Sequence, residues 1–160
     1  MISNNTPMKK FLLFFLLPAI LLSSCKKDSF NATTQAATDD ASIQAYMKAN
    51  NITDATKDPS GLYYEVITPG TGPYPNANSI ITVNSTGKLL NGTVFDTETS
   101  LTIPLTSVIK GWQIGIPHIN TGGRILLMVP SALGYGNTAN SGIPKNSVLI
   151  FTVDLLGFNN

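Results

Sequence analysis

Short segments of β-forming residues follow one another from residue 61 to residue 156, and glycine, proline and asparagine separate them. Residues 80–86 alternate apolar and polar side chains, which is typical of a half-buried strand. Residues 124–129 and 148–156 are the richest in Ile, Leu, Val and Phe, and further strands are expected at 61–68, 93–96 and 101–105. This pattern of strands and turns predicts an antiparallel sheet.

One segment within this region has helical spacing instead. Val108, Ile109, Trp112 and Ile116 fall on one face of a helix, and Pro117 is expected to end it. Strands joined by turns, with a single short helix among them, favour the α+β class. We therefore expect a curved antiparallel β-sheet wrapped on one short α-helix. A chain of 160 residues with 42% hydrophobic residues is long enough for one such domain with a real core.

The composition argues against two classes of function. The formal net charge of +1 is too small to indicate a nucleic-acid partner. The chain has one Cys and one His, so it cannot form a disulfide framework or a Cys/His metal site by itself. We expect neither a metal nor a cofactor.

The N-terminus has the pattern of an export signal. Lys9 and Lys10 precede an apolar run over residues 11–22, which is much shorter than the roughly 20 residues that a spanning helix needs. The run ends in Leu22-Ser23-Ser24-Cys25, which resembles the lipobox of bacterial lipoproteins. That resemblance implies that residues 1–24 are a signal peptide and that Cys25 becomes lipidated and attaches the chain to a membrane. The alternative is an uncleaved signal anchor with an incidental cysteine.

Three further parts are expected after the signal. Residues 25–41 are small and polar, which predicts a flexible tether. Residues 42–57 are expected to form a short N-terminal helical segment, with Asp39 and Asp40 as possible caps. Its apolar residues at helical spacing are Ile43, Tyr46 and Met47. Residues 58–160 are expected to form the folded domain.

Five small motifs follow one another in a fixed order through this domain. They are Val94-Phe95-Asp96, Val108-Ile109-Lys110-Gly111-Trp112, Val129-Pro130-Ser131-Ala132-Leu133-Gly134-Tyr135-Gly136, Gly142-Ile143-Pro144 and Phe151-Thr152-Val153-Asp154-Leu155-Leu156. Their order and spacing resemble the FKBP-type peptidyl-prolyl cis/trans isomerases, in a bacterial lipoprotein form. The resemblance covers residues 61–158 and implies a pocket between the sheet and the helix.

The resemblance also implies roles for individual residues. Trp112 would form the floor of the pocket, Tyr135 would donate a hydrogen bond at its rim, and Asp96 would accept one at its edge. The residues implied to contact the substrate are Phe95 as a flank, Val108 and Phe151 as walls, Ile109 through its backbone N–H, and Ile143 on the far side.

Two positions depart from the family pattern. Ser85, in the strand Val83-Asn84-Ser85-Thr86-Gly87, stands where the family usually has a tyrosine of the site. Leu101 stands where a phenylalanine is common. Both remain candidate substrate-binding residues, and the loss of two aromatic rings predicts a wider, wetter pocket with weaker catalysis and weak macrolide binding.

The function that the resemblance implies is prolyl isomerisation that assists the folding of exported proteins in the cell envelope. Its partners would be proline-containing polypeptides and, through Cys25, a membrane. A second hypothesis, favoured by Ser85 and Leu101, is a non-catalytic chaperone-like or scaffold module that uses the same groove. A third is a part in a larger machine of the cell envelope.

Overall fold

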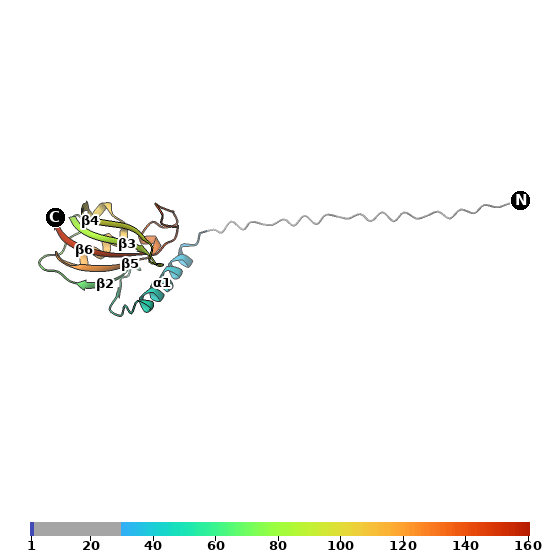
Figure 1. The fold of residues 1–160 in the computed structure, drawn as a ribbon, viewed down its shortest axis with the longest axis horizontal. Coiled ribbons are helices and arrows are strands. Elements are labelled where there is room, and N and C mark those ends of the chain that lie inside the picture. Colours follow the sequence, from blue (N-terminus) through green and yellow to red (C-terminus); the bar gives the residue numbers. More distant parts are fainter. Residues whose placement is uncertain (2–29) are drawn as a thin grey trace.

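The computed structural model describes Met1 and residues 30–160. Six antiparallel strands form one curved sheet in the order β1-β2-β5-β6-β3-β4 (Figure 1). The strands are β1 (Thr56–Lys57), β2 (Tyr63–Thr68), β3 (Ile80–Leu89), β4 (Val94–Pro104), β5 (Arg124–Val129) and β6 (Leu149–Asn159). Two α-helices accompany the sheet, α1 (Ala32–Ala49) and α2 (Lys110–Gly115). The predicted α+β class and the curved antiparallel sheet with a short helix are confirmed.

The strand β4 is continuous where the sequence predicts two separate strands at 93–96 and 101–105. A bulge interrupts the pairing with β3 without ending the strand. The partner of Val83 is Leu101 and that of Ser85 is Glu98, so β4 holds one extra residue at this point. At the bulge, Ser100 takes a positive φ of 53°, and its backbone N–H donates to the Asn84 side-chain oxygen at 2.8 Å. This hydrogen bond replaces the pairing that the bulge interrupts.

The helix α2 lies very close to β5. A Cβ atom on Gly111 would be 2.6 Å from a methyl group of Val129, and one on Gly115 would be 2.4 Å from a methyl group of Leu127. Only glycine at these two positions, one helical turn apart, allows this approach. The α-helix ends at Gly115, and Pro117 lies in a 3₁₀ turn over Ile116–His118 instead of directly ending the helix.

The two faces of the sheet carry separate apolar clusters. The larger one includes Trp112 and Phe151 and lies on the side of α2. The smaller one contains Ile43 of α1 together with Tyr63, and the helix covers this second face. Tyr64, the next residue of β2, packs against the larger cluster instead, because successive side chains of a strand point to opposite faces.

The helix α1 begins ten residues earlier than expected. Residues 32–41, assigned to the tether, are helical, and Asn31 is the N-cap, with its side-chain oxygen accepting from the Thr34 N–H at 3.0 Å. Asp39 and Asp40, expected as caps, lie inside the helix. The helical part of the 42–57 segment ends at Ala49, and residues 56–57 pair with β2 as β1.

The expected signal peptide and the lipidated Cys25 lie outside the described residues, except for Met1. Within residues 30–160, neither α-helix combines the length and the apolar character that crossing a bilayer requires.

Candidate functional site

A cavity of about 280 Å³ lies between four parts of the fold. These are β4, the start of α2, strand β6, and the segment that contains Tyr135 and follows β5. Most of its lining is apolar, and the polar side chains at it are one carboxylate and two hydroxyls. The lining residues are Asp96, Leu101, Ile103, Ser107, Val108, Ile109, Trp112, Tyr135 and Phe151.

Three aromatic rings from three separate segments form a series at this cavity. The Trp112 ring meets the Phe151 ring edge-to-face, with 5.4 Å between centroids and 87° between planes. Phe151 meets Phe95 in the same way, at 5.5 Å and 87°. Such edge-to-face contacts fix ring orientation as well as bury area. Trp112 and Phe151 are each only 4% exposed, so they form a rigid floor and wall.

Gly87 of β3 makes room for these rings. A Cβ atom there would lie 2.6 Å from the Phe95 ring and 2.9 Å from the Phe151 ring, both shorter than any normal contact. Gly87 is paired with Asp96 of β4 and with Phe151 of β6. The packing of the Phe95 and Phe151 rings beside the cavity therefore requires glycine at position 87.

The start of α2 presents a backbone donor to the cavity. Ile109 is the N-cap of α2, in an extended conformation with φ −59° and ψ 153°, and its carbonyl accepts from the Trp112 N–H at 3.0 Å. Among the described residues nothing accepts a hydrogen bond from the Ile109 N–H. Gln113 holds the preceding turn, because its amide donates to the Val108 carbonyl at 2.7 Å. Ile109 can therefore offer its N–H to a bound carbonyl.

Tyr135 and Asp96 are the polar groups at the mouth of the cavity. Tyr135 is 38% exposed, and the glycines on either side of it both donate their N–H groups to the Ser131 carbonyl, at 3.0 Å and 2.8 Å. Asp96 is half-buried at the start of β4. In the described part of the chain, neither side chain has a protein hydrogen-bond partner, so both remain available to a ligand.

Seven of the ten residues expected in the site line the cavity. They are Asp96, Leu101, Val108, Ile109, Trp112, Tyr135 and Phe151. Phe95 lies behind Phe151 in the ring series, and Ile143 is 4% exposed within the larger apolar cluster. Ser85 is buried in β3 and does not line the cavity.

Two lining residues were not expected from the sequence. Ile103 lies two residues beyond Leu101 on the same strand, so the alternation of residues 101–105 already placed both on one face. Ser107 directly precedes the Val108-Ile109 motif. Strand periodicity was thus a usable signal for Ile103, whereas only the folded turn brings Ser107 to the cavity.

Two buried polar atoms in this region have no hydrogen-bond partner among the described residues, the Ser85 hydroxyl and the Trp112 indole nitrogen. A buried hydroxyl without a partner is costly. Among the described residues, Ser85 therefore carries a buried hydroxyl without a partner in β3, outside the lining of the cavity.

The electrostatics of the site are simple. Three carboxyl groups have lowered pKa values: Asp40 beside Lys57, Asp58 hydrogen-bonded by Ser60, and Asp154 beside Arg124. None of them lines the cavity. The described residues contain no group of three or more His, Cys, Asp or Glu that could hold a metal ion. What the cavity offers is an apolar surface for a ring, a backbone donor, two hydroxyls and a carboxylate.

Comparison with known proteins gives a consistent result. The family pattern of FKBP-type peptidyl-prolyl cis-trans isomerases matches residues 72–156. The chain is 40% identical over 121 residues to the FKBP-type peptidyl-prolyl cis-trans isomerase FkpA of Buchnera aphidicola, covering 72% of this chain and 48% of that protein. It is also 40% identical to the peptidyl-prolyl cis-trans isomerase Mip of Coxiella burnetii, covering 71% of this chain and 52% of Mip.

The fold has a solved counterpart. The crystal structure of FkpA from Escherichia coli matches with a TM-score of 0.70 and 33% identity, over 79% of this chain and 62% of that one. This chain spans about half the length of the curated relatives it matches. The matched region contains the three-ring series, the start of α2 and the rim tyrosine, and on this basis the chain belongs to the FKBP-type peptidyl-prolyl cis-trans isomerase family.

Proposed function

We propose that this chain accelerates cis/trans isomerisation of X-Pro bonds in proline-containing polypeptides. The observation that carries the proposal is the apolar cavity that brings Trp112, Phe151 and Val108 together around the Ile109 N–H. A proline ring fits such a floor and walls, and the free N–H is placed to bind a carbonyl of the same peptide.

The reaction needs no acid, base or nucleophile from the protein. The amide barrier of ~18–20 kcal/mol arises because rotation breaks resonance between the nitrogen and the carbonyl. The twisted amide at the top of that barrier is less dipolar than the planar one, so an apolar cavity disfavours the planar ground state relative to the transition state. An acceleration of about 10⁵-fold corresponds to lowering the barrier by ~7 kcal/mol.

The polar groups at the mouth of the cavity would hold the peptide on either side of the proline in place. The Tyr135 hydroxyl would donate to a carbonyl near the proline, and Asp96 would accept from a donor of the peptide at the edge of the site. Holding the flanking chain while the amide rotates lowers the entropy that the transition state must lose.

The test is proline exchange in a short X-Pro peptide, followed by NMR with catalytic amounts of the full chain, in detergent if it is membrane-attached. Acceleration is expected, and it should be lost in Trp112→Ala and reduced in Tyr135→Phe, which keeps the ring. Tyr74→Ala is a matched control because Tyr74 is 57% exposed and does not line the cavity. No acceleration by a folded wild-type chain would refute the catalytic proposal.

A non-catalytic binding module remains the second candidate, and the Ser85 hydroxyl without a partner is the observation that favours it. Ser85→Tyr separates the two functions. A large gain in turnover would support a weakened isomerase site. Zero activity before and after the change, with retained binding of an unfolded polypeptide, would support the module.

The proposal also includes attachment to a membrane through lipid on Cys25, outside the cytoplasm. It is supported by Lys9 and Lys10, the apolar run of residues 11–22 and the Leu22–Cys25 motif. Incorporation of labelled palmitate that disappears in Cys25→Ser is the expected result. Labelling that persists in this variant would refute it.

Co-purification of cell-envelope components with the wild-type chain would support a part in a larger machine.

A further inference from the structure

The segment between β5 and Tyr135 is organised around one residue, Ser131. It begins the 3₁₀ turn Ser131–Leu133 and is 2% exposed. Its carbonyl accepts from the N–H of Gly134 at 3.0 Å and from the N–H of Gly136 at 2.8 Å. Since Tyr135 lies between these two glycines, the position of Ser131 determines where the rim tyrosine stands.

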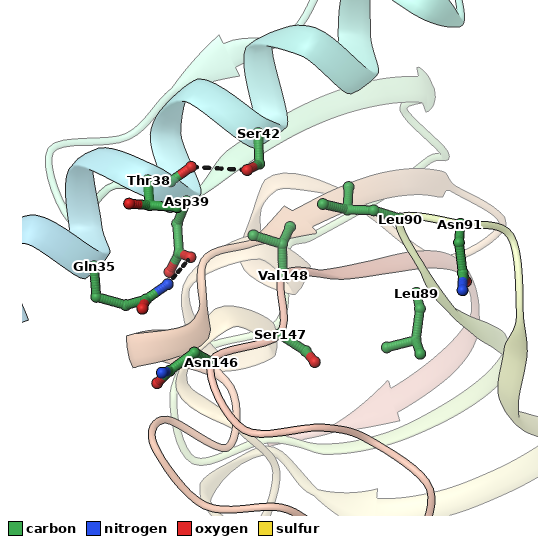
Figure 2. Close-up of a pocket in the computed structure, with 10 residues that line it drawn as sticks. All are labelled: Gln35, Thr38, Asp39, Ser42, Leu89, Leu90, Asn91, Asn146, Ser147 and Val148. Atoms are coloured by element: carbon green, nitrogen blue, oxygen red, sulfur yellow. Dashed lines mark hydrogen bonds between the residues drawn. The ribbon is translucent and has the colours of Figure 1, made fainter. Parts of the chain in front are cut away.

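Ser131 is in turn held by a residue of α1. One carboxylate oxygen of Asp39 accepts from the Ser131 N–H at 2.8 Å and from the Ser131 hydroxyl at 2.6 Å. The other oxygen accepts from the side-chain amide of Gln35 at 2.7 Å, one turn earlier in the same helix (Figure 2). Asp39 is 2% exposed, so these three hydrogen bonds replace its contacts with water.

A buried carboxylate tolerates little displacement of its donors. Hydrogen bonds to an ionised group are about twice as strong as neutral ones, and leaving such a group unpaired in the interior is costly. The Asp39–Ser131 contact is therefore geometrically strict, although the two residues are 92 positions apart in the chain. No other described side chain is hydrogen-bonded to Ser131.

The helix that carries Asp39 is itself fixed to the sheet. Ile43, one turn further on, is fully buried in the cluster with Tyr63 and Met128. Asp40 pairs with Lys57 of β1 and accepts from the Tyr63 hydroxyl at 2.8 Å. Because these contacts fix α1 to the sheet, Asp39 holds Ser131 in a defined position.

We propose that Asp39 is a positioning residue of the site: α1 sets the place of Tyr135 through the Asp39–Ser131 contact, so the N-terminal helix belongs to the working unit of the cavity. This inference rests on the proposed function only in so far as Tyr135 contacts the bound peptide. The coupling between helix and rim can be measured without any activity.

The first measurement is hydrogen exchange of the full chain, followed by mass spectrometry. Asp39→Ala should speed exchange in the peptide covering residues 131–136 and leave exchange in β3 and β6 unchanged. The matched control is Asp54→Ala, which removes an exposed carboxylate that lies outside α1 and accepts from the neighbouring Thr53 hydroxyl. Faster exchange of 131–136 in the control as well, or in neither variant, would overturn the inference.

The second measurement is the split between KM and kcat for the X-Pro peptide. Asp39→Ala should lower kcat/KM by about 2- to 30-fold, mainly through KM, while Asp54→Ala leaves it unchanged. If Asp39→Ala does not fold, Asp39→Asn and Ser131→Ala carry the test. Ser131→Ala removes one donor and keeps the backbone hydrogen bond, so a smaller effect in the same direction is expected.

The outcomes separate the two proposals. If the wild-type chain is inactive, the proposed function fails, and the exchange measurement alone decides whether α1 holds the rim. If the wild-type chain is active and exchange at 131–136 rises without any change in kcat/KM, the positioning role is wrong and the isomerase proposal stands.

Discussion

Gly87→Ala tests the packing beneath the cavity most directly. The Cβ of alanine would lie 2.6 Å from the Phe95 ring and 2.9 Å from the Phe151 ring. Because carbon atoms in normal contact are ~3.5–4.0 Å apart, one or both rings must move by about 1 Å. Phe151 is buried against Trp112, so the displacement should reach the floor of the cavity.

The magnitude follows from two opposing effects. Overpacking of this kind costs ~1–3 kcal/mol. Replacing glycine by alanine in a strand contributes ~0.5–1 kcal/mol in the other direction, since alanine has less backbone freedom to lose. Gly87 does not have a positive φ, so no backbone strain is added. The free energy of unfolding should therefore fall by about 1 kcal/mol, within limits of about 0 and 2.5 kcal/mol.

The assay is urea unfolding followed by the fluorescence of Trp112, the only tryptophan in the sequence. With an m-value of ~1–3 kcal/mol/M, the midpoint should fall by a few tenths of a molar or more, at unchanged m. The folded-state emission should also change, because the Trp112 ring contacts Phe151.

Gly157→Ala is the matched control. Gly157 lies in β6, has no positive φ, and a Cβ there would have no atom within 4 Å. This variant should be as stable as the wild type or slightly more stable. If Gly87→Ala has the same midpoint and the same emission as Gly157→Ala, the argument that the rings require a glycine is wrong.

Two further predictions concern charge and capping. Arg124 donates to both carboxylate oxygens of Asp154, at 2.6 Å and 2.8 Å, and it lowers the pKa of that carboxyl from its usual 3.8. Because the folded pKa is the lower one, the contribution to stability is present above pH 3.8 and disappears as the pH falls through the folded pKa. In thermal melts near neutral pH, Asp154→Asn should have a lower Tm than the wild type, and this difference in Tm should disappear below pH 3.8. A difference in Tm that stays constant into strong acid would contradict this. Asn31→Ala should weaken the first turn of α1 by about 1 kcal/mol and speed exchange at residues 32–36, and unchanged exchange there would show that the cap contributes nothing.

Much of the fold could be predicted from local patterns. Alternation in residues 80–86 and the Ile/Leu/Val-rich run of 124–129 correspond to β3 and β5, because periodicity of two is a direct consequence of strand geometry. The helical spacing around Trp112 located α2. The resemblance based on the ordered motifs led to six of the nine cavity-lining residues, and Leu101 was a seventh, named as a departure from the family pattern. These features depend on neighbours along the chain, which the sequence displays.

Other features depended on partners far away in the chain. Asp39 reads locally as a helix cap, because aspartate favours that position. In the folded protein it lies inside α1, where the donors of Ser131 make its burial possible. The single β4 likewise depends on Asn84, which accepts from the Ser100 N–H across the strand pair.

The sequence by itself determined the α+β class, the strands β2, β3, β5 and β6, the short helix α2 and the set of residue types available to the site. Only the tertiary structure decided that Trp112, Phe151 and Phe95 stand in one series of rings, that Ser85 is buried without lining the cavity, and that Asp39 of α1 binds Ser131. The physical reason is that periodicity and propensity are local quantities, whereas close packing and the pairing of buried polar groups are satisfied only between segments that the fold brings together.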